Sequence, residues 1–133
     1  MDMTSKFSIE QKDVDGVECL YIKGYLDAHT APELESKIEA IIKNGGNKIL
    51  VNFSSLDYIS SAGLGVFMAF IEDIRFNGGD IKLTEMQPKV FSVFDLLGFP
   101  ILFDIELSDD DAIAKFLKQN IDSIADITGQ DGK

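Results

Sequence analysis

The chain has few of the residues that form disulfides, metal centres or membrane spans. Cys19 is its one cysteine, so no internal disulfide can form, and its place in a strand pattern favours a small buried side chain. His29, the one histidine, has no Cys or His neighbour at metal-ligand spacing. No apolar run approaches the roughly 20 residues that span a bilayer, and residues 1–10 are mixed and polar, unlike a signal peptide. We therefore expect a cytoplasmic protein that binds no metal.

Positive charge is also scarce. The chain of 133 residues has 12 Lys and Arg against 23 Asp and Glu, which gives a net charge of −11. Nucleic acids and anionic membranes are bound through positive patches, so we expect neither as a direct partner. The same charge allows a basic protein partner.

Residue patterns typical of enzymes are missing as well. The run 61–65, Ser-Ala-Gly-Leu-Gly, lacks the Gly-Lys-Ser/Thr of a phosphate-binding loop, and its Gly-x-Gly is too short to indicate a dinucleotide site. A triad of Ser61, His29 and an aspartate is conceivable, but the serine is not in a Gly-x-Ser-x-Gly elbow. A lone histidine in a loop is more often a solvated side chain. The sequence therefore favours a protein that is not an enzyme and needs no cofactor.

Strand and helix patterns alternate along the chain. Its length suggests one domain, residues 1–133, large enough to bury a core. The expected strands are 7–12, 17–24, 48–53, 80–84 and 101–103, and the expected helices are 30–43, 62–76, 88–97 and one from 108 onward. Thr30 and Glu33 have the spacing of a capping box at the first helix. We predict an α/β fold, with a mixed, mostly parallel sheet of about five strands, about four helices packed against it, and a flexible tail over 128–133.

Two serines stand where the third strand passes into the second helix, in the run Ser60-Ser61-Ala62-Gly63. A serine at such a junction has an exposed hydroxyl, and free backbone N–H groups lie close by. This favours an anion site or a phosphorylation switch. Serine is also a favoured N-cap residue, so one of the two can cap the helix while the other stays exposed.

The second helix has apolar residues on two sides, which a spacing of about 100° per residue separates into stripes. One stripe contains Leu64, Phe67, Met68 and Ile71, and the opposite stripe contains Ala62, Val66, Ala69 and Phe70. Only one stripe can face the sheet of a two-layer domain. The second is either covered by another part of the chain or exposed beside Ser61, and large exposed apolar patches tend to mark protein interfaces. We expect the second stripe to contact a partner.

Several stretches, in order along the chain, point to one family. The run 58–66 reads Tyr-Ile-Ser-Ser-Ala-Gly-Leu-Gly-Val, and further motifs lie at 24–31, 51–56, 77–83 and 94–99. The run 58–66 resembles the signature of STAS domains, the bacterial anti-sigma factor antagonists. Residues 24–31 resemble that family's Gly-x-Leu-Asp loop, and 51–56 its Asn- or Asp-bearing strand before the switch serine. The resemblance covers roughly residues 6–118, with a single STAS-like domain as the implied fold.

The resemblance implies a small adaptor in partner switching. Unphosphorylated, such a protein binds an anti-sigma factor that is also a serine kinase, so that a sigma factor is released. The kinase then phosphorylates the switch serine, binding is lost, and a PP2C-type phosphatase restores it. Aligned on Gly63, the switch serine is Ser61; Ser60, in place of the family's aspartate, is the runner-up.

By the same resemblance Asp27 and Asn52 would flank the serine, although a loop aspartate is usually a turn-former. A phosphate at a helix start need not disturb the fold, so its effect should fall on the partner. The predicted partner-binding residues are Asp27, Asn52, Ala62, Val66, Ala69 and Phe70.

Two other functions stay open at this point. Domains that resemble STAS also serve as ligand-binding or assembly subunits in transport and stress-sensing complexes, where the serine would not turn over. A small hydrolase or nucleotide-binding enzyme is the weakest alternative, because the sequence shows no base–nucleophile constellation and no phosphate loop.

Overall fold

The computed structural model describes residues 6–129, with side chains described for residues 6–119. Its elements are β1 (Ser8–Val14), β2 (Val17–Leu26), α1 (Ala31–Lys43), β3 (Lys48–Ile59), α2 (Ser61–Phe76), β4 (Asp80–Thr84), α3 (Pro88–Leu96), the 3₁₀ turn η1 (Phe99–Ile101), β5 (Asp104–Glu106) and α4 (Asp109–Gly129). One five-stranded sheet has the order β1-β2-β3-β4-β5, with β1 antiparallel to β2 and the other pairs parallel. The predicted α/β fold with a mixed, mostly parallel sheet is confirmed.

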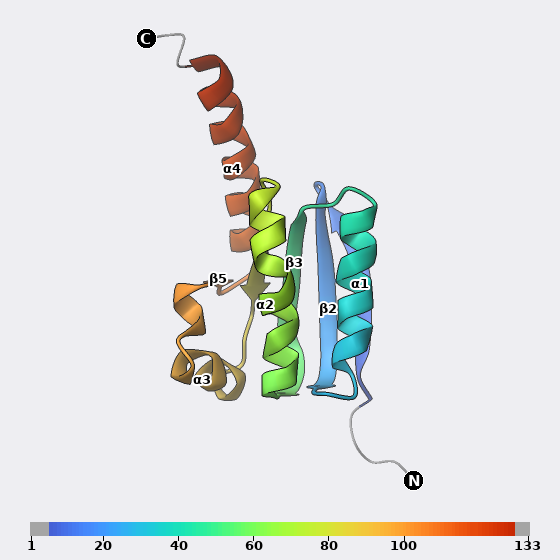
Figure 1. Ribbon diagram of the computed structural model, residues 1–133. Coiled ribbons are helices and arrows are strands. Elements are labelled where there is room, and N and C mark those ends of the chain that lie inside the picture. The colour runs from blue at the N-terminus through green and yellow to red at the C-terminus, as the bar shows by residue number, and fades with distance from the viewer. Residues whose placement is uncertain (1–5, 130–133) are drawn as a thin grey trace.

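The connections between parallel strands decide which face each helix covers. Each moves one strand further in the same direction across the sheet, so right-handed crossovers place α1, α2 and α3 on one face. Figure 1 shows α1 and α2 side by side in front of β2 and β3. Helix α4 follows the last strand and covers the opposite face, where Ala112 and Phe116 pack on Val17, Cys19 and Leu50.

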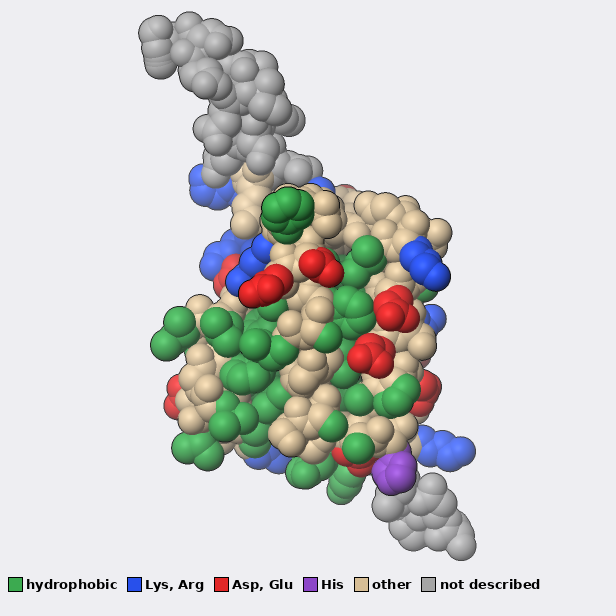
Figure 2. Space-filling view, in the orientation of Figure 1, with side chains coloured by type: hydrophobic (Ala, Val, Ile, Leu, Met, Phe, Trp, Pro, Cys, Tyr) green, Lys and Arg blue, Asp and Glu red, His purple; other side chains and the backbone are tan. Residues whose placement is uncertain are grey.

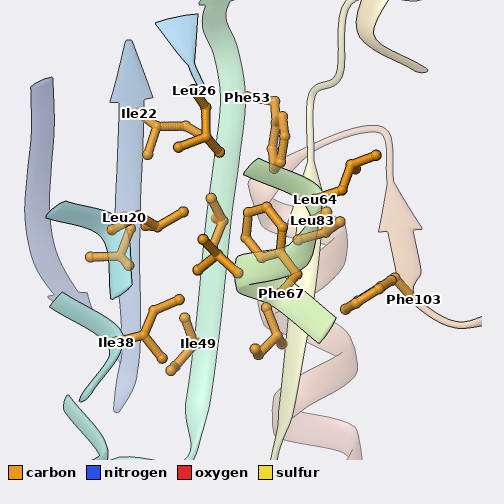
Figure 3. Packing of buried hydrophobic residues seen from close by; sticks show 14 of the residues in the cluster. Leu20, Ile22, Leu26, Ile38, Ile49, Phe53, Leu64, Phe67, Leu83 and Phe103 are labelled. Atoms are coloured by element: carbon orange, nitrogen blue, oxygen red, sulfur yellow. The ribbon is translucent and has the colours of Figure 1, made fainter. Parts of the chain in front are cut away.

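The main core lies between the sheet and the first three helices. Successive side chains of a strand point to opposite faces, so Val51 and Phe53 of β3 join this core while Leu50 faces α4. Phe67 of α2 is fully buried, with ring centroids 5.8 Å from Phe53 and 6.3 Å from Phe103 (Figure 3). This contact fixes α2, and therefore its first residue, relative to the sheet.

A lysine is buried beneath α4. Lys82 in β4 is 1% exposed and forms ion pairs of 3.0 Å with both Asp80 and Asp104. Its ammonium group also lies 4.7 Å from the centre of the Phe116 ring of α4. Lys115 of α4 reaches Asp104 at 3.2 Å. Two carboxylates and an aromatic face therefore compensate the buried cation and hold α4 to the sheet.

Two predictions about strands are wrong. The run 101–103 is not a strand, because Gly98 in the left-handed region (φ 77°) and Pro100 tighten the chain into η1, and β5 begins only at Asp104. The third strand does not end at residue 53 but continues to Ile59, because its pairing with β2 resumes after register shifts. Of the predicted tail, residues 128–129 belong to α4, and 130–133 lie outside the described residues.

Cys19 is buried, as its strand position predicted, and burial raises the pKa of its thiol to about 11. A thiol with so high a pKa is a poor nucleophile at neutral pH. Within residues 6–129, no helix combines the length and apolar character needed to cross a membrane.

Candidate functional site

A single residue, Ser60, separates β3 from α2. Its backbone is extended (φ −102°, ψ 174°), and its Oγ accepts a hydrogen bond of 3.4 Å from the N–H of Gly63. The N–H of Ser60 donates to the carbonyl of Leu26 at 3.0 Å, which ties the junction to the end of β2. The prediction that one of the two serines caps the helix is confirmed for Ser60.

Ser61 is the first residue of α2 and is exposed, whereas Ser60 is half-buried. It stands at the positive end of a 16-residue helix whose first turn contains no acidic residue. The helix dipole and the first-turn N–H groups favour negative charge at this position. A phosphate on Ser61 would therefore be accommodated without refolding the helix.

The two glycines that follow Ser61 have different reasons to be glycine. A Cβ on Gly63 would lie 2.8 Å from the carbonyl oxygen of Leu26 and 3.0 Å from Cγ1 of Ile59, so only glycine lets α2 approach β2 this closely. No atom lies within 4 Å of a Cβ built on Gly65. Gly65 is exposed one turn after Ser61, and it leaves the surface beside the serine without a side chain.

Asp27 lies at the same end of the sheet, because the preceding Leu26 pairs with Ile59 next to the serines. Its Oδ1 accepts hydrogen bonds from the N–H groups of His29 (2.9 Å) and Thr30 (3.3 Å). Asp27 therefore shapes the turn before α1, as is usual for a loop aspartate. Its predicted contact with a partner stays a prediction.

The predicted capping box of the first helix is wrong. Thr30 makes no side-chain bond to the amides of α1. Its hydroxyl instead donates to the carbonyl of Tyr25 at 2.8 Å and accepts from the N–H of Asp27 at 2.9 Å. The Thr30 hydroxyl is therefore used within the loop before α1 and does not cap the helix.

The structure does not bring Asn52 to Ser61. Asn52 precedes Ser60 by eight residues in β3, a distance of roughly 25 Å along an extended strand. Its side chain donates to Asp109 of α4 at 2.9 Å and accepts from the N–H of Ser54 at 2.8 Å. Asn52 therefore joins β3 to the start of α4, and its predicted partner contact stays untested.

The predicted apolar stripe of α2 is only partly on the surface. Ala62 and Ala69 are exposed and Phe70 is half-buried, but Val66 is 3% exposed within the main core. Met68, which belongs to the first stripe of α2, is 43% exposed. The division of α2 into one sheet-facing stripe and one exposed stripe is wrong at Val66 and Met68. Helix α2 packs against α1 as well as against the sheet, so its buried side is not the side that the stripes indicated. Val66 is not available to a partner in this conformation.

The histidine of the conceivable triad is not joined to the serine. His29 is exposed, and its backbone N–H donates to Asp27. Among the side chains that the structure describes, no hydrogen bond connects His29 with Ser61. The conceivable triad is therefore not assembled in this structure.

Sequence reasoning missed two exposed tyrosines at the end of the sheet that carries Ser61. Tyr25 and Tyr58 are 43% and 48% exposed, are register partners in β2 and β3, and have ring centroids 5.5 Å apart. Each directly precedes a buried residue, Leu26 or Ile59. The alternation of strand side chains is the signal that could have placed both rings on the opposite face.

A second missed feature is an apolar surface, the α3–η1 patch, formed by Leu96, Leu97, Ile101 and Leu102. These side chains are 85%, 53%, 89% and 41% exposed. Figure 2 shows apolar side chains gathered over α3 and η1 and continuing beside α2. Exposed apolar side chains gathered in this way are typical of a protein interface.

Comparison with known proteins places this geometry in a family. The STAS domain family model matches residues 8–112, and the chain belongs to that family. BtrV of Bordetella bronchiseptica, assigned by name to the anti-sigma factor antagonists, is 32% identical over 103 residues, which cover 77% of this chain and 89% of BtrV.

Solved structures agree with this assignment. A Thermotoga maritima protein, described in its crystal structure as an anti-sigma factor antagonist, superposes with a TM-score of 0.77 at 25% identity, over 81% of this chain and 93% of that one. The Bacillus protein SpoIIAA, in its unphosphorylated form, has a TM-score of 0.70 at 23% identity, over 83% of this chain and 95% of its own, and shows the fold alone. The family predicted from the motifs is confirmed.

Proposed function

We propose that this protein is an anti-sigma factor antagonist whose binding to an anti-sigma factor kinase is controlled by phosphorylation of Ser61. The observation that carries the proposal is that Ser61 is the exposed first residue of α2, next to a serine already engaged as the N-cap. The names of similar proteins support the regulatory class. Under this proposal the protein is a cytosolic adaptor without catalytic activity of its own.

Ser61 is a better acceptor than Ser60 for a geometric reason. A kinase must reach the hydroxyl oxygen and bring it in line with the γ-phosphate of ATP. The Ser60 hydroxyl is half-buried and turned toward the N–H of Gly63, and its backbone N–H is bonded to Leu26. The exposed Ser61 has no such constraint.

Phosphorylation would act on the partner rather than on the fold. A phosphate adds about −1.5 to −2 charges and a tetrahedral group. Ala62 and Gly65 beside Ser61 are small and exposed, so an unphosphorylated surface permits close approach by a partner. The added group would occupy that space and block the close approach of the partner. A PP2C-type phosphatase would then restore the binding-competent form.

The α3–η1 patch supports a protein as the partner. It exposes four large aliphatic side chains on the helical face that also carries α2 (Figure 2). The net charge of −11 favours a partner surface with basic residues around an apolar centre.

The acceptor assignment is tested by incubating the protein with ATP and each candidate anti-sigma factor kinase, and locating phosphate by mass spectrometry. We expect labelling of the wild type and of Ser60→Ala, and none of Ser61→Ala. Ser60→Ala removes the cap and should lower stability by about 1 kcal/mol, so thermal unfolding must show that it is folded at the assay temperature.

Labelling of Ser61→Ala at full yield would show that the acceptor is a different residue. A wild type that no candidate kinase labels would instead favour the ligand-binding or assembly subunit, in which the serine does not turn over.

A further inference from the structure

Tyr25 and Tyr58 form an aromatic pair on the sheet face opposite α1 and α2. Their neighbours Leu26 and Ile59 belong to the main core, so strand alternation directs the two tyrosines away from it. The rings are tilted by 45° with centroids 5.5 Å apart. The carbonyl of Tyr25 accepts a bond from the Thr30 hydroxyl, which fixes the backbone beneath the pair. We name Tyr25 and Tyr58 the tyrosine pair.

The tyrosine pair supplies the largest exposed side chains of the two segments that flank Ser61. Within residues 25–29 and 57–62 the other exposed residues are Ala28, His29, Ser61 and Ala62. An aromatic side chain can bury 150–250 Å² in an interface, roughly, and tyrosine is enriched among the residues that dominate binding energy. A protein that encloses Ser61 therefore finds two large aromatic side chains to contact on the tyrosine pair.

The charge around the pair indicates what it would bind. The negative face of an aromatic ring attracts cations, and a guanidinium can stack on it. Asp27 follows Tyr25 by two residues, whereas Asp57, directly before Tyr58, lies 3.8 Å from Lys89 of α3 and therefore belongs to the helical side of the sheet. Lys23 lies further back along β2, away from the serine. With a net charge of −11, the protein as a whole also attracts a basic surface.

We propose that the tyrosine pair is a specificity determinant that receives an arginine or lysine side chain of the kinase that phosphorylates Ser61. This inference rests on the proposed function and adds a named contact to it. The pair lies on the sheet face and is distinct from both the apolar stripe of α2 and the α3–η1 patch. It would anchor the kinase beside Ser61 in the unphosphorylated state without taking part in phosphoryl transfer.

The test compares two double variants that differ only in the aromatic face. Tyr25→Phe with Tyr58→Phe keeps both rings, whereas Tyr25→Leu with Tyr58→Leu keeps apolar area without them. Phe76→Leu is the matched control, because Phe76 is 90% exposed at the last residue of α2, the end opposite Ser61. Affinity for the kinase that labels the wild type is measured with ADP, and the kinetics of Ser61 phosphorylation are measured with ATP.

We expect the double leucine variant to bind about ten-fold more weakly and to raise KM for phosphorylation, with kcat within about two-fold of the wild type. The double phenylalanine variant and Phe76→Leu should stay within about two-fold in affinity. Thermal unfolding of all variants establishes that each is folded under the assay conditions.

A folded double leucine variant with wild-type affinity would overturn the inference and leave the proposed function intact. Equal weakening by the phenylalanine variant would overturn it too, because the hydroxyls rather than the ring faces would then carry the contact. A wild type without affinity for any anti-sigma factor kinase would overturn the proposed function and, with it, this inference.

Discussion

Two adjacent serines at one strand–helix junction occupy different chemical environments. Ser60 is extended, with its hydroxyl turned to the amide of Gly63, and Ser61 begins the helix with its side chain in solvent. This division could be predicted from sequence because capping is a local effect. The positions of Asn52 and Val66 could not, because they depend on where α4 and α1 pack against their neighbours.

The two glycines of the signature give a prediction at this scale. Gly63→Ala should destabilise the protein by about 2 kcal/mol, because its methyl group would press on the Leu26 carbonyl and force α2 away from β2. Gly65→Ala, in the same helix with open space around it, should stabilise by about 0.5–1 kcal/mol. Urea unfolding of both variants measures the difference, and equal effects of the two substitutions would contradict this account of the close helix–strand approach.

At the scale of elements, the least predictable part of the chain is the segment from η1 to α4. A run of three apolar residues at 101–103 contains too little periodicity to fix a strand, and the observed strand begins three residues later. In that register Asp104 pairs with Lys82 of β4. The burial of Lys82 likewise follows from the position of α4 and not from any feature of β4 alone.

Asp104, which pairs with Lys82 and Lys115, gives a prediction about how stability depends on pH. Burial raises the pKa of Asp104, but hydrogen bonds with Glu106, Lys82 and Lys115 outweigh burial and lower it from 3.8 to about 2. A carboxyl group with a lowered folded-state pKa stabilises the protein above its unfolded pKa, and this contribution is lost as the pH falls toward the folded value. The contribution of Asp104 should therefore disappear between about pH 4 and pH 2.

Thermal unfolding of the wild type and Asp104→Asn across this range measures that contribution. The Tm of the wild type should exceed that of Asp104→Asn near pH 4, and this difference should vanish as the pH falls to about 2. Asp110→Asn, at an exposed acid of α4, is the matched control. Glu106 has a raised pKa because of its hydrogen bond with Asp104, so its contribution is lost as the pH rises, in a different window. A Tm difference that stays constant down to pH 2 would contradict the assignment.

At the scale of the whole molecule, helices cover both faces of the sheet and hold the strand–helix junction with Ser61 in place. Strand–helix alternation predicted this arrangement, because parallel strands require crossovers and right-handed crossovers fix the faces. Of the surfaces suited to a partner, the tyrosine pair joins two strands that meet only in the folded chain, whereas the α3–η1 patch comes from one run, residues 96–102, whose exposure depends on how α3 and η1 pack.

The net charge of the whole molecule explains why a phosphate on Ser61 would act locally. The chain already has a net charge of −11, so about two further charges change its overall charge little. The effect must come from the position of the new group, at the exposed start of α2 among small side chains. We therefore expect phosphorylation to leave the unfolding transition nearly unchanged while it alters the affinity for a partner.

The most direct test of the account is the affinity of the anti-sigma factor kinase for the protein before and after stoichiometric phosphorylation. Isothermal titration calorimetry in the presence of ADP should show binding weakened by about 100-fold or more in the phosphorylated form. Ser61→Ala, treated in the same way, should keep the affinity of the unmodified protein. Equal affinity of the phosphorylated and unphosphorylated wild type, with both forms folded, would contradict the claim that Ser61 is the switch.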